Sequence, residues 1–88
     1  MNVLYEKSFL RDIEKLRDQS VRDDVTVFIE NIKKGDNPMA LSNVKKLKGH
    51  HAAYRISIGM YRLGFFFENN TAILTRFLHR KDIYKRFP

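Results

Sequence analysis

The first part of the chain spaces its apolar residues as helices do, after a short opening strand. Residues 3–7 predict the strand, and Phe9, Ile13 and Leu16 then follow at intervals of three and four residues. Ser8 precedes this stripe and is a good N-cap, because its hydroxyl oxygen can accept a hydrogen bond from a backbone N–H of the first turn. The pattern therefore predicts a strand followed by an amphipathic helix that begins after Ser8.

A second apolar stripe predicts a longer helix. It is formed by Val21, Val25, Phe28, Ile29 and Ile32. Gly35 ends the stripe, as glycine commonly does after a helix. We expect the two helices to form a hairpin, joined near Gln19 and Ser20, whose apolar faces pack on a sheet. A loop over residues 36–43, marked by Asn37-Pro38, follows the second helix.

Three further stretches then predict an antiparallel meander. Side chains suited to the two faces of a sheet alternate over residues 54–58 and 61–67, and residues 72–78 make the last strand. Gly59-Met60 and Asn69-Asn70 supply the two turns between them. The order of elements predicts one α+β domain over residues 1–88, a two-layer sandwich of a strand, a helical hairpin and three antiparallel strands.

The two-residue turn at Gly59-Met60 fixes the register of the first hairpin. It pairs Ser57 with Arg62 and Arg55 with Gly64, so these four residues share one face of the sheet. The other face carries Tyr54, Ile56, Ile58, Tyr61, Leu63, Phe65 and Phe67, which suits burial under the helices. Gly64 is expected to leave open space beside the two arginines. Two neighbouring guanidiniums suit a phosphate, although a solvated sheet face explains them equally well.

The register of the last strand stays open between two alternatives. A two-residue turn at Asn69-Asn70 places Phe77 opposite Arg62 and His79 on the Arg62 face. A three-residue turn places Arg76 opposite Arg62 instead. In either register, several basic residues should converge near one end of the sheet: Arg55, Arg62, Arg76, His79 and Arg80.

Composition adds an uneven distribution of charge. The 88 residues have a net charge of +7. Residues 1–44 hold seven Lys and Arg against eight acids, whereas residues 45–88 hold ten against two. A polyanion would therefore meet the second half, where Lys45, Lys46 and Lys48 form the densest basic segment.

Several classes of protein are excluded or disfavoured. Without cysteine there is no disulfide scaffold and no thiolate zinc site. No apolar stretch has the length of a membrane span and no signal peptide is evident, so the cytoplasm is the expected location. The adjacent His50 and His51 would point apart on a strand and have no third ligand, so neither a metal nor another cofactor is expected.

Four segments together resemble the RelE/ParE superfamily of toxins from type II toxin–antitoxin systems. They are FLRDIEKL at 9–16, KLKG at 46–49, YRISIGMYR at 54–62 and HRKDIY at 79–84. They occur in the order and spacing of that family and cover nearly the whole chain. The resemblance implies a microbial-RNase-like fold and a toxin that cleaves mRNA, typically on the ribosome, until a cognate antitoxin wraps it.

The resemblance also implies a metal-independent site in which RNA's 2′-hydroxyl attacks the adjacent phosphate. The family's catalytic positions fall on Arg62, His79, Arg80 and Tyr84, and its lysines on Lys45, Lys46 and Lys48. Arg55 and Arg76 are expected to hold further phosphates, and an exposed Phe66 to stack a base or contact the antitoxin.

Two other functions remain open. The superfamily also contains toxins that inhibit DNA gyrase on the same fold, and a non-catalytic binding module would show the same surface charge. Without the resemblance, a strand-end histidine would be a surface residue and a late tyrosine would pack on the sheet. The presence of Arg62, His79 and Tyr84 together favours the ribonuclease.

Overall fold

A five-stranded sheet organises residues 1–41 and 43–88, the part of the chain that the computed structural model describes. In chain order the elements are β1 (Asn2–Tyr5), α1 (Lys7–Glu14), α2 (Gln19–Lys34), a 3-10 helix (Pro38–Ala40), β2 (Val44–Lys46), β3 (Ala53–Ile58), β4 (Tyr61–Glu68), β5 (Thr71–His79) and α3 (Arg80–Arg86). The strand order is β1-β5-β4-β3-β2, in which β1 runs parallel to β5 and the other pairs are antiparallel.

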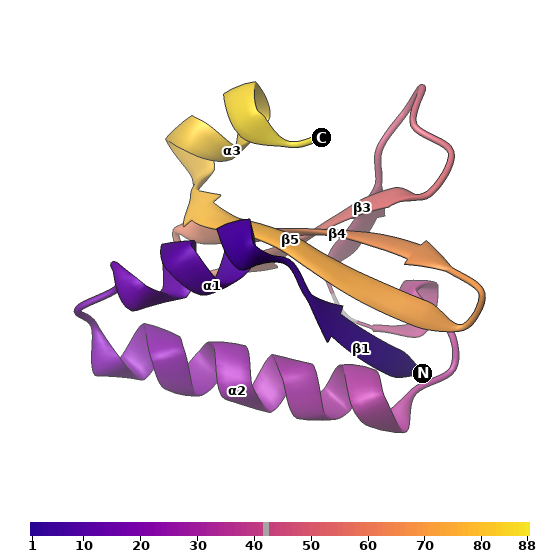
Figure 1. The fold of residues 1–88 in the computed structure, drawn as a ribbon, viewed down its shortest axis with the longest axis horizontal. Helices are drawn as coiled ribbons and strands as arrows, with labels where there is room; N and C mark the ends of the chain where they lie inside the picture. Colours follow the sequence, from indigo (N-terminus) through magenta and orange to yellow (C-terminus); the bar gives the residue numbers. More distant parts are fainter. Residues whose placement is uncertain (42) are drawn as a thin grey trace.

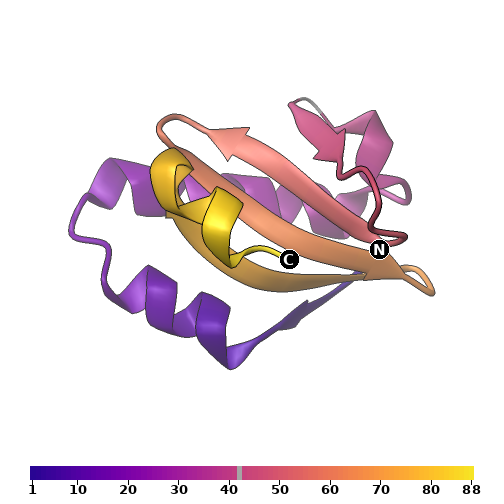
Figure 2. The same ribbon diagram turned by 90° about the horizontal axis from the view of Figure 1, so that it is seen from above.

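The helices cover the two faces of the sheet unequally. Figure 1 shows α1 and α2 together below the sheet and α3 above it, and Figure 2 shows α3 lying across the strands from the other side. The predicted α+β fold is confirmed, with its strand, helical hairpin and antiparallel meander. Three elements were not expected: the 3-10 helix, which lies in the predicted loop, β2, which widens the sheet at one edge, and α3, which follows the last predicted strand.

The main core lies between the sheet and the helical hairpin. Leu63, Phe65, Leu74 and Ile32 are all 0% exposed, and they pack with the apolar stripes of α1 and α2. Burial of such apolar surface is the dominant favourable contribution to folding. No helix among residues 1–41 and 43–88 has the length and apolar character needed to cross a membrane.

The start of each hairpin helix differs from the prediction. The N-cap of α1 is Glu6 without a side-chain bond, and Ser8 lies inside the helix, where its hydroxyl donates to the Thr75 carbonyl at 2.6 Å. The prediction that Ser8 caps α1 was therefore wrong. Its hydroxyl is hydrogen-bonded to the backbone carbonyl of Thr75 on β5 instead. Asp18 caps α2, with its carboxylate accepting from the Ser20 N–H at 3.0 Å.

The register of β3 and β4 is as predicted, and that of β5 is not. Ser57 pairs with Arg62 and Arg55 with Gly64, as the turn at Gly59-Met60 requires. The β4–β5 turn also has two residues, because Glu68 pairs with Thr71. A bulge then adds one residue to β5, so that Phe65 faces Leu74 while Gly64 faces Arg76.

Both alternatives for the last strand were therefore wrong. Beyond the bulge, Leu78 lies opposite Arg62, and His79 lies opposite Tyr61 on the face that carries the main core. Thr75 is the extra residue of this bulge, and the Ser8 hydroxyl gives its backbone carbonyl a hydrogen-bond partner.

Candidate functional site

The turn between β3 and β4 brings Arg62 and the start of α3 to one end of the sheet. The Nη1 atom of Arg62 donates to the Gly59 and Tyr61 carbonyls, at 3.0 and 2.9 Å. The backbone N–H of Arg80 donates to the Met60 carbonyl at 2.9 Å. Both predicted arginines therefore contact the same turn, although they come from β4 and α3.

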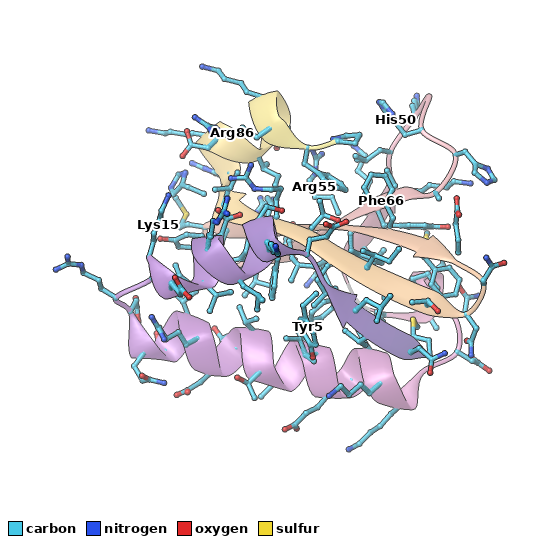
Figure 3. All side chains as sticks on the ribbon, in the orientation of Figure 1. Tyr5, Lys15, His50, Arg55, Phe66 and Arg86 are labelled. Atoms are coloured by element: carbon cyan, nitrogen blue, oxygen red, sulfur yellow. The ribbon has the colours of Figure 1, made fainter. Side chains whose placement is uncertain are left out.

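Tyr84 and Arg55 form a second contact on the same face of the sheet. The Arg55 guanidinium carbon lies 4.5 Å from the centre of the Tyr84 ring, which suits a cation–π interaction. The Tyr84 residue is 61% exposed, so its hydroxyl can reach a ligand from solvent. Figure 3 shows Arg55 on the side of the sheet that α3 covers.

Register and helical spacing add two further cations to this face. Lys45 pairs directly with Arg55 across β2 and β3, and paired residues of antiparallel strands share a face. Arg80 precedes Tyr84 by four residues on α3, so the two side chains lie on one side of that helix. We define the basic face as Lys45, Arg55, Arg62 and Arg80, together with Tyr84.

The remaining lysines lie beside the basic face. Lys46 pairs with Tyr54 at the end of β2, and Lys48 belongs to the following loop. Both are exposed, and they line a shallow hollow that also includes His50 and His51. A backbone phosphate could approach this loop from solvent.

His79 lies on the other side of α3 from Tyr84. Its ring packs edge-on against Tyr61, with the ring centres 5.9 Å apart. Its Nδ1 atom accepts from the Lys81 N–H at 3.1 Å and thereby caps α3. A neutral imidazole that accepts at Nδ1 carries its proton on Nε2.

His79 lines a cleft of about 370 Å³ between α1, β5 and α3. Lys15 on α1 and Arg86 on α3 also line it, and Figure 3 shows both on the same side of the molecule. The expected convergence is thus only partial. The structure groups Arg62 with Arg80 at the turn and Tyr84 with Arg55, and it places His79 in the α1–α3 cleft.

Arg76 is held by an ion pair with Asp12 of α1. Its Nε and Nη2 atoms donate to the two carboxylate oxygens at 2.8 and 3.0 Å, and the same carboxylate accepts from the Phe77 N–H at 2.9 Å. The side-chain hydrogen bonds to Asp12 raise the pKa of Arg76 above its ordinary value. β1 ends opposite Leu74, so α1 can reach this edge of β5.

The predicted open space at Gly64 is absent, because Phe87 fills it. A Cβ added to Gly64 would lie 2.5 Å from Cγ and Cδ2 of the Phe87 ring. The prediction of an exposed Phe66 was also wrong, since it is half-buried with its ring centre 5.2 Å from that of Phe87. Both corrections have one cause, which is that α3 packs on this face of the sheet.

Asp12 and Phe87 were missed by the sequence reasoning, although each left a signal. Asp12 lies three residues after Phe9 and four before Leu16, so it is an acid within an apolar stripe. Phe87 follows Ile83 by four residues, the spacing of one helix face.

Comparisons with known proteins show the family and the fold. No family model matches the chain. The toxin RelE3 of Methanocaldococcus jannaschii is 37% identical over 89 residues and is covered completely, as is this chain. The RelB-RelE antitoxin-toxin complex from Methanococcus jannaschii contains a chain that is 35% identical, with a TM-score of 0.82 over 97% of this chain and 99% of that one.

Two more distant structures share the fold. The YoeB dimer from Staphylococcus aureus gives a TM-score of 0.74 at 14% identity, over 91% of this chain and 97% of that chain. The toxin-antitoxin complex RelBE2 from Mycobacterium tuberculosis gives a TM-score of 0.60 at 22% identity, over 90% of this chain and 96% of that chain. Since the identity of 37% to RelE3 extends over the whole of both chains, the protein belongs to the RelE family of toxins.

Proposed function

We propose that this toxin is a metal-independent endoribonuclease that cleaves mRNA on the ribosome. The observation that supports it best is the basic face, where the Arg55 guanidinium lies against the ring of an exposed Tyr84, while Arg62 and the start of α3 with Arg80 meet at the β3–β4 turn. Cations around a proton-transfer group suit the cleavage of a phosphodiester, in which negative charge develops on the phosphate oxygens.

In the proposed reaction, the 2′ oxygen bonds to the adjacent phosphorus and loses its proton to a water molecule, while the bond to the 5′ oxygen breaks and that oxygen gains a proton. Arg62 and Arg80 stabilise the charge of the pentacovalent phosphorane. Tyr84 donates the proton to the 5′ oxygen, because its hydroxyl is the exposed acid on the basic face.

The role of His79 follows from its hydrogen bond. To take the 2′ proton at Nε2, the ring would have to move its own proton to Nδ1 and release the Lys81 N–H. We therefore assign His79 chiefly to capping α3, which carries Arg80 and Tyr84. Its predicted part in proton transfer remains a prediction that a matched pair of variants can test.

RNA binding is assigned to the lysines and to one arginine. Lys45, Lys46, Lys48 and Arg55 would hold backbone phosphates, which orient the strand without reading its sequence. Arg76 was predicted to join them, but its guanidinium already donates to Asp12, so we assign it a structural role instead.

A cognate antitoxin is the proposed protein partner. A chain of 35% identity is the toxin of an antitoxin-toxin complex, and residues 45–88 hold ten Lys and Arg against two acids. An acidic antitoxin segment would complement that charge, so its affinity should fall as salt rises. An affinity that is equal at low and high salt would show that the basic face is not the antitoxin site.

Cleavage assays with purified protein test the function directly. Cleavage of mRNA, with and without ribosomes, should survive EDTA and should stop when the RNA is replaced by an all-deoxy strand. Equal cleavage of the deoxy strand would rule out attack by the 2′-hydroxyl. Gyrase-dependent DNA breaks without loss of mRNA would instead identify a gyrase inhibitor, and unaffected growth on induction without antitoxin would identify a non-toxic binding module.

A further inference from the structure

A second, smaller core attaches α3 to the sheet. Ile83 and Phe87, one helical turn apart, are 0% and 4% exposed. They pack with the buried Ala53 of β3, and the half-buried Phe66 and Leu78 lie against them. The chain after α3 turns back over the strands, as Figure 2 shows. Contacts with the sheet must hold this helix, since seven residues are too few for a stable isolated helix.

Gly64 gives the Phe87 ring its place in that core. An added Cβ at Gly64 would lie 2.5, 2.5 and 2.8 Å from Cγ, Cδ2 and Cε2 of the ring. Carbon atoms do not approach so closely without displacing one another. The ring therefore fits against bare backbone, and any side chain at Gly64 would push it away.

The position of Tyr84 depends on this anchor. Tyr84 is 61% exposed, and its contact with Arg55 is a single cation–π interaction, which contributes little at an exposed site. It lies one residue after Ile83 and three before Phe87, and the Phe87 N–H donates to the Ile83 carbonyl at 2.9 Å. The N-terminal end of α3 is held separately, by the bond from the Arg80 N–H to Met60.

We propose that Phe87, seated against Gly64, is a positioning residue that places Tyr84 beside Arg55 for cleavage. The proposal rests on the proposed ribonuclease function. Phe87 does not touch RNA in this scheme. It acts through Tyr84 by fixing the last turn of α3, and Gly64 acts by leaving room for the ring.

Three variants test the proposal in single-turnover cleavage at saturating RNA. Phe87→Ala should slow cleavage by about 100-fold, the effect of displacing a reacting group by about 1 Å. Gly64→Ala should have a similar effect, because the new methyl group displaces the ring. The double variant should be no slower than either single one, since both changes remove the same contact. Affinity for RNA should stay nearly constant in all three.

Two further measurements separate positioning from a general loss of stability. Tyr84→Phe should slow the wild type strongly but add little in the Phe87→Ala background, where the tyrosine is already displaced. Val25→Ala, a change in the main core on α2, is the matched control, and it should lower the melting temperature without changing the rate. Phe87→Leu retains an apolar anchor and should recover part of the rate if Phe87→Ala folds poorly.

Hydrogen exchange distinguishes failure of this proposal from failure of the proposed function. The last amides of α3 should exchange faster in Gly64→Ala than in the wild type, whether or not the protein cleaves RNA. If the wild type does not cleave RNA, only the proposed function is lost. Folded Phe87→Ala and Gly64→Ala proteins that cleave at the wild-type rate, or that keep wild-type exchange in α3, would overturn the positioning role.

Discussion

The ion pair between Asp12 and Arg76 should stabilise the fold, and its removal should leave RNA affinity unchanged. The Asp12 carboxylate accepts three hydrogen bonds, two from Arg76 and one from the Phe77 N–H. The Asp12 side chain is only 4% exposed and that of Arg76 is 22% exposed. Because Asp12 belongs to α1 and its partners to β5, this one carboxylate joins the helix to the sheet.

The geometry sets the expected cost of removing either partner. Asp12→Leu would leave the Arg76 guanidinium and the Phe77 N–H unpaired, and breaking a buried pair in this way costs about 3–5 kcal/mol. Because Arg76 is partly exposed and can recover contact with water, we expect a value near the lower end, about 3 kcal/mol. For a domain of this size, that lowers the melting temperature by roughly 12–24 °C. Arg76→Met should cost a similar amount, since it leaves the Asp12 carboxylate buried without a cation.

The double variant separates the structural role from RNA binding. Asp12→Leu with Arg76→Met leaves no uncompensated charge and keeps the net charge of +7. Its remaining deficit should be about 1 kcal/mol, from the Phe77 N–H that keeps no partner. Melting curves of the four proteins give the coupling, and RNA affinity at one salt concentration gives the role in binding. If the folded double variant binds RNA as weakly as Lys46→Ala does, Arg76 contacts phosphate and its assignment here is wrong.

Further predictions concern the basic face and the two helix caps. Arg62→Ala should raise the activation free energy of single-turnover cleavage by about 3–4 kcal/mol while changing RNA affinity little. A folded variant that cleaves at the wild-type rate would contradict this role. Lys46→Ala should do the opposite, weakening RNA binding and reducing the slope of its salt dependence by about 0.7–0.9, as a salt titration measures. His79→Asn keeps a side-chain acceptor for the α3 cap and should retain the melting temperature and most of the cleavage rate. His79→Ala should lose about 1 kcal/mol of stability. A His79→Asn rate as low as that of Tyr84→Phe would assign His79 to proton transfer. Hydrogen bonds from the Ser20 hydroxyl and N–H lower the pKa of Asp18 below its ordinary value of 3.8, so its stabilisation is present above that pH and is lost as pH falls through the folded-state value. When the pH is lowered from neutral to below 3.8, the free energy of unfolding of Asp18→Asn, measured in urea melts, should therefore fall by less than that of the wild type.

The elements that sequence could predict are those with local causes. The α2 stripe belongs to a helix of sixteen residues, and its buried members Val25, Phe28 and Ile32 are among those that the spacing selects. The β3–β4 register follows from a two-residue turn with Gly59 at a positive φ of 58°, a conformation that glycine adopts readily. Once that turn is fixed, Arg55 and Arg62 must share a face.

The parts that sequence could not predict depend on contacts between distant residues. The bulge after Leu74 has no turn signal of its own, and it is accompanied by the hydroxyl of Ser8, 67 residues from Thr75. The helix α3 has only Ile83 and Phe87 as an apolar face, so its periodicity is too short to stand out from a basic tail. The same missing helix explains why open space was predicted at Gly64.

The bulge also decides which side chains can act together. Without it, β5 would continue in the register set by its turn, with Phe77 opposite Arg62 and His79 on the Arg62 face. One extra residue reverses the faces beyond Leu74, so that His79 packs on Tyr61, and Arg76 contacts Asp12 at the edge of the sheet. The basic face is consequently assembled from the β3–β4 hairpin, β2 and α3, while β5 contributes structural contacts to α1. Because α3 starts directly after β5, the register that moves His79 off the Arg62 face also fixes where Arg80 and Tyr84 begin, and the proposed site depends on both.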